Sequence, residues 1–344
     1  MSAPDHGPGH PLAAAAGVHP IPLPTPFPVG DVNCWLIEDD PLTLVDVGPA
    51  TAAALVALER GLAARGRRIE DLERVLLTHE HADHLGLTDI VLDRSGAELV
   101  VLDALAPRLE RADELFRRET RFTGALMERH GVPTDVVVAL VPMQRAHAAF
   151  ANPSVPVGRT VADGESVAFA DRTLRVHHRP GHSMTDTIFV DEARRLAIGG
   201  DHLLEAISSN PLMACEPERL SRAEAPTADD RVRTLPRYEE SLSATARMGL
   251  EVVVGGHGPP VTDVAPLVAE RAQATERRKA KIHGLLPPEG ATAFEIGRRM
   301  WGDVALKSAY LVISEVVGHL DLLEADGAVA PQLVDGVERW LPQQ

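Results

Sequence analysis

Cysteine is scarce in this chain of 344 residues, and the marks of secreted and membrane proteins are missing. The two cysteines, Cys34 and Cys215, are far apart and form neither a disulfide framework nor a CxxC metal pair. No stretch approaches the ~20 apolar residues of a membrane helix. Segment 1–19 lacks the positive start and long apolar core of a signal peptide, so we expect a flexible lead-in there. We therefore expect a cytoplasmic protein without a membrane partner.

Positive charge is also in short supply, because the formal net charge is −16 at pH 7. General nucleic-acid binding requires Lys and Arg surfaces that neutralise phosphates, so the charge argues against a nucleic-acid partner. The hydrophobic content of 44% supports a substantial core. The length suits one large domain, or one large and one small domain.

Short apolar runs bounded by turn residues predict two β-rich halves, each followed by helices. In the first half we expect a helix at 52–64, another from about residue 85, and strands at 32–37, 42–47, 74–77 and 98–102. In the second half we expect a helix at about 236–248 and strands at 166–168, 174–177, 188–190, 196–199 and 252–255. This order favours an α/β sandwich.

Residues 103–150 interrupt this pattern and read as mostly helical. They carry five large side chains in a chain with only 3% aromatic residues: Phe116, Phe122, Met127, Met143 and Phe150. Two interpretations remain open. The segment is either a cap that lines a substrate pocket, or a pair of extra helices with an ordinary core.

From residue 265 to residue 344 the pattern becomes helical and ends in a hairpin. The expected helices are 267–285, 293–300 and 309–325, and the expected hairpin is 328–341. Three helices and a hairpin are typical of a winged-helix module. This segment contains nine Lys and Arg residues and eleven Asp and Glu residues, so no basic groove is evident. We expect it to pack on the preceding domain or on a second subunit of a homodimer.

One segment concentrates metal-binding side chains. His79, His81, Asp83 and His84 lie within six consecutive positions, directly after the apolar run 75–77. Neutral imidazole and carboxylate suit Zn²⁺ and similar first-row metals. In an extended loop His79 and His81 project to the same side, while Glu80 points away. The segment therefore predicts a metal site.

Three further candidates follow predicted strands elsewhere in the chain: His182, Asp201 and His257. Glycine directly precedes each of them, which lets the backbone turn sharply and bring a short side chain close to a shared centre. Each is a weak signal alone. Together, in this order and all at strand ends, they are a strong one.

The complete pattern resembles the metal signature of the metallo-β-lactamase fold superfamily. It consists of His79-x-His81-x-Asp83-His84 followed by His182, Asp201 and His257, and the strand pair ending at Asp46-Val47-Gly48 also resembles the family's opening element. The resemblance covers roughly residues 20–262. It implies a four-layer αβ/βα sandwich, here domain 20–264, with metals at one edge between two sheets.

Carried over residue by residue, the resemblance implies two divalent metal ions. His79, His81 and His182 would hold one ion, Asp83, His84 and His257 the other, and Asp201 would bridge them. Zn²⁺ is the expected metal, with Mn²⁺ and Fe²⁺ as alternatives. Asp46 is either an anchor that hydrogen-bonds to the metal loop or a turn-capping aspartate.

Such a centre implies a hydrolase that uses a metal-bridging hydroxide, because bound metals make hydroxide available near neutral pH. Asp83 and Asp201 are the expected catalytic residues, and a small thioester or carboxylic ester is the expected substrate. Glyoxalase-II-type thioesterases share all seven ligands, whereas true β-lactamases of this fold lack the bridging aspartate. A regulator that only binds metal is the non-enzymatic alternative, and the complete ligand set argues against it.

Two other activities remain as alternatives. Quorum-quenching lactonases have a similar metal set but carry a tyrosine shortly after the bridging aspartate, and here the only tyrosines are Tyr238 and Tyr310. The C-terminal segment resembles the small winged-helix extension of the β-lactamase-like protein 2 group, some members of which cleave single-stranded RNA. A lactonase and a single-strand-specific endoribonuclease are therefore the alternatives to the esterase prediction.

Overall fold

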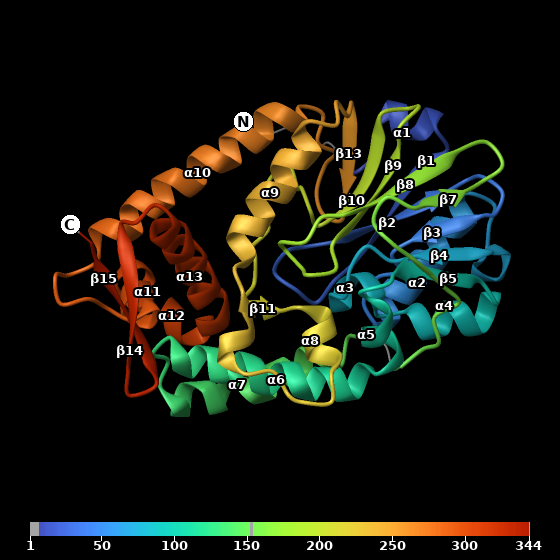
Figure 1. The fold of residues 1–344 in the computed structure, drawn as a ribbon. Helices are drawn as coiled ribbons and strands as arrows, with labels where there is room; N and C mark the ends of the chain where they lie inside the picture. The colour runs from blue at the N-terminus through green and yellow to red at the C-terminus, as the bar shows by residue number, and fades with distance from the viewer. Residues whose placement is uncertain (1–6, 152–153, 344) are drawn as a thin grey trace.

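The computed structural model describes residues 7–151 and 154–343, in which two β-sheets lie between helices and a helical C-terminal part follows (Figure 1). The six-stranded sheet has the order β1 (Val18–Leu23), β2 (Val32–Ile37), β3 (Thr43–Val45), β4 (Arg74–Leu76), β5 (Glu98–Leu102) and β6 (Arg159–Val161). Its first three strands are antiparallel, and β3 to β6 are parallel.

The five-stranded sheet has the order β13 (Val252–Gly255), β10 (Leu196–Gly200), β9 (Thr187–Asp191), β8 (Thr173–His178) and β7 (Ser166–Ala168). Only β10 and β13 pair in parallel. Successive strand residues point to opposite faces of a sheet. Accordingly Phe189 and Ile198 belong to the core shared with the six-stranded sheet, whereas Ile188 and Ala197 face the helices outside.

Helices cover the outer faces of both sheets. Helices α2 (Ala52–Ala64) and α4 (Thr88–Ser95) pack on the six-stranded sheet through Leu58, Leu62 and Val91. On the other side, α9 (Thr234–Ala246) covers the five-stranded sheet with Leu235 and Leu242. The predicted four-layer α/β sandwich is confirmed.

Residues 103–150 form α5 (Ala106–Glu110), α6 (Ala112–Arg129) and α7 (Thr134–Ala148), which reach from the sheets toward the C-terminal helices (Figure 1). The segment contributes both to a core and to the wall of a pocket. Phe122 and Met127 are buried in a core shared with the C-terminal helices, whereas Phe116 lines a pocket. Phe150 packs edge-on against Phe27, with ring centroids 5.6 Å apart. The Met143 side chain lies outside the described part of the chain.

The C-terminal part consists of α10 (Val264–Gly284), α11 (Ala293–Trp301), α12 (Val304–Lys307) and α13 (Ala309–Ala325), followed by β14 (Val329–Val334) and β15 (Val337–Pro342). Thr292 and Glu295 form a capping box at the start of α11. Helix α13 is buried among α6, α9, α10 and α11. The expected helices and hairpin are present, an arrangement compatible with an extra domain.

The expectation of a flexible lead-in over 1–19 is wrong for residues 11–19. Helix α1 (Pro11–Ala15) buries Ala13, and β1 pairs with β2 from Val18 onward. Pro20 and Pro22 argue against a strand in the sequence. However, β1 lies at the edge of its sheet, where proline is tolerated because one side of the strand makes no hydrogen bonds to a neighbouring strand. Residues 1–6 lie outside the described residues. Within the described ranges, the structure contains no helix with both the length and the apolar character of a membrane span.

Several short elements were also missing from the prediction. They include β6, α8 (Pro217–Ser221), α12, the pair β11 (Ala214–Cys215) and β12 (Arg231–Val232), and the single turns Ile69–Asp71 and Ala228–Asp230. Elements of two to five residues carry too little periodicity to stand out from loops.

An ion pair with a buried carboxylate joins β12 to α13. Arg231 of β12 donates from Nη1 and Nη2 to the two carboxylate oxygens of Asp321, over 2.7 Å and 2.8 Å. Asp321 is fully buried. Removing one partner of such a pair leaves an uncompensated buried charge.

We therefore expect Asp321→Ala to lower the free energy of unfolding by about 3–5 kcal/mol, because Arg231, whose side chain is only 15% exposed, loses its partner. Chemical denaturation measures the loss. The matched control is Arg233→Ala, which breaks the neighbouring pair with Glu324, where the Arg233 side chain is half exposed; here we expect at most about 1 kcal/mol. Equal losses in the two variants would contradict the account.

Candidate metal centre

The seven predicted ligands come together at one edge of the sandwich. His79 comes three residues after the end of β4, and His182 comes four residues after the end of β8. Asp201 comes directly after β10, and His257 comes two residues after β13. The ligand atoms form three overlapping groups, each within 4.8 Å: His79, His81 and His182; His79, His84 and Asp201; and Asp83, His84 and His257.

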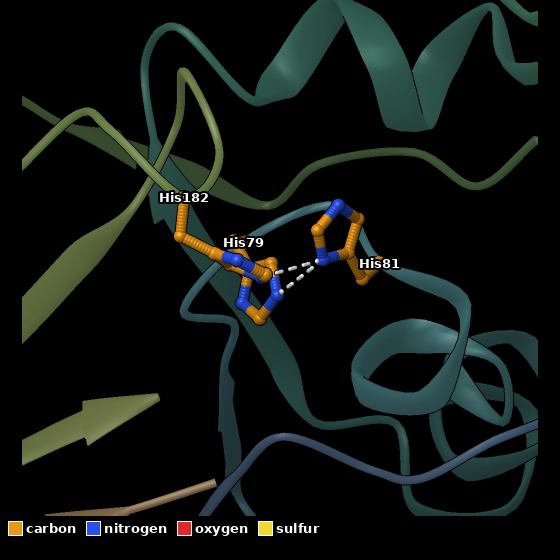
Figure 2. A group of neighbouring side chains, drawn as sticks. All are labelled: His79, His81 and His182. Carbon is orange, nitrogen blue, oxygen red and sulfur yellow. Dashed lines mark hydrogen bonds between the residues drawn. The ribbon is translucent and has the colours of Figure 1, made fainter. Parts of the chain in front are cut away.

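The first group points three ring nitrogens at one another (Figure 2). His81 Nδ1 lies 3.0 Å from His79 Nε2 and 2.9 Å from His182 Nε2. One ring nitrogen offers one lone pair or one hydrogen, so His81 Nδ1 cannot bond to both neighbours. A metal ion accepts one lone pair from each ring, and tetrahedral zinc at about 2.0–2.1 Å from nitrogen sets its ligands about 3.3 Å apart. The triangle fits a metal better than it fits hydrogen bonds.

The second group lies beside it, with Asp201 between the two. His257 Nε2 is 3.3 Å from Asp83 Oδ2. Asp201 Oδ1 is 3.4 Å from His84 Nε2, whereas Asp201 Oδ2 is 3.6 Å from His182 Nε2 and 3.5 Å from His257 Nε2. Asp201 thus faces ligands of both groups, as a bridging carboxylate must.

Buried polar atoms in this cluster lack partners. Among the described residues, His84 Nε2, His257 Nε2 and Asp201 Oδ1 are buried and make no well-oriented hydrogen bond. Such atoms cost free energy unless something binds them. Two imidazole nitrogens and a carboxylate oxygen are donors that divalent first-row metals accept, so these residues fit metal ions.

The other ring nitrogen of three histidines is fixed from outside the centre. Thr78 Oγ1 donates to Asp46 Oδ2, so its oxygen accepts from His79 Nδ1, 3.0 Å away. His84 Nδ1 donates to Asp46 Oδ2, and His257 Nδ1 donates to the Asp31 carbonyl, each over 2.8 Å. These bonds fix the ring orientations and point each Nε2 at the centre, where a metal ion would take its lone pair.

Asp46 is therefore an anchor of the metal loop rather than a plain turn cap. Its Oδ1 accepts the Thr78 backbone N–H over 2.8 Å, while its Oδ2 holds Thr78 and His84. It is 1% exposed and has a left-handed backbone, φ +59°. The structure supports the first of the two interpretations of this residue.

At two positions only glycine fits, because atoms of the metal centre or of its supports lie close to the backbone. A Cβ on Gly256 would lie 2.4 Å from Asp201 Oδ1 and 2.5 Å from His84 Cε1. Gly200 has φ +49°, and a Cβ there would lie 2.6 Å from Thr78 Oγ1. Any side chain at either position would push ligands or their supports apart.

Burial keeps two of the imidazoles neutral. It is the main cause that lowers the pKa of His79 well below its usual range, helped by nearby His84 and His81. Burial, with His81 beside it, also lowers the pKa of His182 to about 4. Neutral imidazole is the form that binds a metal, so these rings need not lose a proton first.

The acidic side of the cluster carries strong negative potential. Burial opposes ionisation of Asp83 and Asp201, but neighbouring histidines outweigh it and lower the pKa of Asp83 to about 2 and that of Asp201 well below its usual range. Burial also lowers the pKa of His84, yet Asp201, Asp46 and Asp83 raise it well above its usual range. The same potential favours a divalent cation.

Several supporting residues carried no signal in the sequence. Glu80 turns away from the centre, as expected, and accepts from the hydroxyls of Ser183 and Thr185. Ser209 donates its hydroxyl to the Asp201 carbonyl. Asn33 and Trp35 of β2 donate to the Gly255 carbonyl below His257. Ordinary residue types at large sequence separation gave no pattern to detect.

The remaining histidines near the centre are not part of the ligand groups. His202 Nε2 lies 2.8 Å from Thr245 Oγ1, and His178 Nε2 donates to the Met184 carbonyl over 2.8 Å. His177 joins none of the three groups either.

A pocket of about 370 Å³ opens over the ligands Asp83, His182, Asp201 and His257.

Comparisons with known proteins agree with this geometry. The family model described as "Metallo-beta-lactamase superfamily" matches residues 27–257. The chain is 33% identical over 310 residues to the probable metallo-hydrolase YqjP of Bacillus subtilis (strain 168), covering 90% of this chain and 92% of that protein.

Solved structures extend the likeness over nearly the whole chain. A metallo-beta-lactamase family protein from Thermus thermophilus has 28% identity and a TM-score of 0.75, with 95% of this chain and 99% of that one covered. A beta-lactamase domain protein from Burkholderia ambifaria shares the fold at 24% identity and a TM-score of 0.77, with 95% and 92% covered. The chain therefore belongs to the metallo-beta-lactamase superfamily, as a metal-dependent hydrolase.

Proposed function

We propose that the protein is a dinuclear hydrolase that cleaves a small thioester or carboxylic ester. The position of Asp201 carries this proposal, because its two carboxylate oxygens face ligands of both groups. His79, His81 and His182 would hold one ion, and Asp83, His84 and His257 the other. We propose Zn²⁺ first, with Mn²⁺ and Fe²⁺ as alternatives.

Bound divalent metals supply a water of lowered pKa and polarise the scissile carbonyl. The chain's own residues set the geometry around that chemistry. Asp201 links the two halves of the centre, and Asp83 lies at the pocket surface, where its carboxylate can orient or carry a proton. Asp46 and the Asp31 carbonyl keep the rings of His84 and His257 from turning.

Of the two alternatives, a lactonase is now favoured over a nuclease, because a lactone is a cyclic ester and because Tyr310 lines a cavity beside the centre. This tyrosine is far from Asp201 in sequence, yet it lines a cavity that also touches His81 and His182. Its hydroxyl donates to the Met213 carbonyl. We rank lactones below open-chain esters because this hydroxyl is already engaged.

A substrate panel on one metal-loaded preparation tests the proposed activity. The panel contains acyl thioesters, carboxylic esters, lactones and single-stranded RNA. We expect turnover of thioesters or carboxylic esters, and none of RNA. Turnover of RNA alone would replace the proposal with the nuclease alternative.

Replacing His81 or Asp201 with Ala is expected to remove most hydrolytic activity and to lower bound metal, because each change takes away a ligand. Elemental analysis of protein purified without added metal measures the metal content, together with kcat. The control is His283→Ala, which removes an exposed histidine of α10 and should change neither value. Unchanged metal content in both site variants would refute the ligand assignment.

Asp46→Asn is expected to weaken metal affinity by about 10–100-fold, because the amide no longer accepts all the bonds from Thr78 and His84. Titration of metal-stripped protein with Zn²⁺ measures this affinity, and excess metal should restore much of the activity. Asp40→Asn, at an exposed turn, is the control. An affinity equal to that of the control would show that Asp46 does not support the centre.

A further inference from the structure

A second cavity borders the metal centre on the side of the helical insertion. It has a volume of about 320 Å³ and shares His81, Ala82 and His182 with the pocket over the ligands. One substrate could therefore place its scissile bond at the metal centre and an attached group in this cavity. Its walls come from α6, from the segment 212–214 and from α13.

One face of α6 forms the outer wall. Ala112, Phe116, Thr120 and Thr123 line the cavity, a spacing of four, four and three residues that places them on the same side of a helix. The other apolar walls consist of nearly fully buried side chains: Leu109, Met184 and Met213. The cavity is therefore preformed and mostly apolar, as small-molecule sites usually are.

The charged residues of this cavity leave no free cation for an anionic group. Glu80, Asp113 and Glu119 supply three carboxylates against the single guanidinium of Arg108. Arg108 Nη2 donates to Glu119 Oε2 over 2.6 Å. Away from the metal ligands His81 and His182, a carboxylate or phosphate would meet more negative than positive side chains, so this part of the cavity suits an uncharged group.

The C-terminal part holds the remaining wall in place. The Tyr310 hydroxyl donates to the Met213 carbonyl, and the Met213 N–H donates to Ser314 Oγ over 3.0 Å. Asn210 Nδ2 donates to the Leu311 carbonyl over 3.3 Å. Helix α13 thus fixes the segment 210–213, and the Tyr310 ring lines the cavity.

We propose that this cavity binds the uncharged, apolar acyl group of the substrate, and that Ala112 and Phe116 of α6 set the longest chain accepted. The inference rests on the proposed ester or thioester hydrolysis, which places the carbonyl at the metal centre. One carbon of an acyl chain takes up about as much space as a water molecule, about 30 Å³. The cavity therefore has room for an acyl chain of roughly six to ten carbons. Tyr310 makes the C-terminal part a component of the substrate site.

The test compares kcat/KM for straight-chain acyl thioesters from acetyl to palmitoyl. For the wild type we expect a rise of about fourfold per added methylene while the cavity fills, and then a fall. Ala112→Leu fills the cavity and should move the optimum to shorter chains, whereas Phe116→Ala enlarges it and should move the optimum to longer ones. Tyr310→Ala should broaden the profile, because it removes the ring that lines the cavity and the bond that holds Met213.

The matched control is Arg121→Ala, on the exposed side of α6, which should keep the wild-type profile. If Ala112→Leu and Phe116→Ala both share the profile of this control, the inference is wrong. Thermal unfolding of each variant separates a change of profile from a loss of folded protein.

A binding experiment separates failure of this inference from failure of the proposed function. If the wild type cleaves no thioester or ester of any length, the proposed function fails. Calorimetric titration with straight-chain alcohols then tests whether the cavity binds alkyl chains, independently of any hydrolysis. Binding that strengthens with chain length and is weakened by Ala112→Leu but not by Arg121→Ala upholds it, whereas no binding, or equal binding by both variants, overturns it.

Discussion

The convergence of four strand ends on one cluster of unpaired ligand atoms is the constraint on which the rest of the structure depends. Loops after β4, β8, β10 and β13 bring four histidines and an aspartate within a few ångströms, and the turn into α3 (Ala82–Leu85) adds Asp83 and His84. These groups satisfy one another poorly, because His81 Nδ1 faces two other ring nitrogens and because buried atoms of His84, His257 and Asp201 make no well-oriented hydrogen bond. Metal ions resolve the conflict, and the bonds to Asp46 and to the Asp31 carbonyl keep the rings ready for them.

The C-terminal part is connected to this centre through the segment that follows Asp201. Arg271 of α10 donates to the carbonyls of Leu204 and Glu205, and α13 holds Asn210 and Met213. The buried pair of Arg231 and Asp321 fixes α13 to the catalytic domain. The helical insertion packs on the same helices through Phe122 and Met127. The pocket beside the metals is thus built by three parts of the chain.

The sequence allowed the prediction of the sandwich and of every strand with a clear apolar pattern. Strands 98–102 and 252–255 and helix 52–64 have the predicted bounds, because alternation and apolar spacing are local properties. Strand β1 was missed because its prolines mask an edge strand. The sequence offered a pocket-lining cap at 103–150, but it did not reveal the other walls of the cavity, which lie far apart in the chain. The ligand residues could be named since they follow strands in a recognisable order, and the superfamily resemblance is confirmed. Their roles, the likeness to the glyoxalase-II metal set and the winged-helix likeness stay predictions.

Anomalous X-ray scattering from crystals of the protein purified without added metal tests the central claim most directly. The account predicts two metal peaks about 3.5–4 Å apart. One peak would lie among His79, His81 and His182, the other among Asp83, His84 and His257, with Asp201 between them. A single peak in an active preparation, or metal bound away from these seven residues, would contradict it.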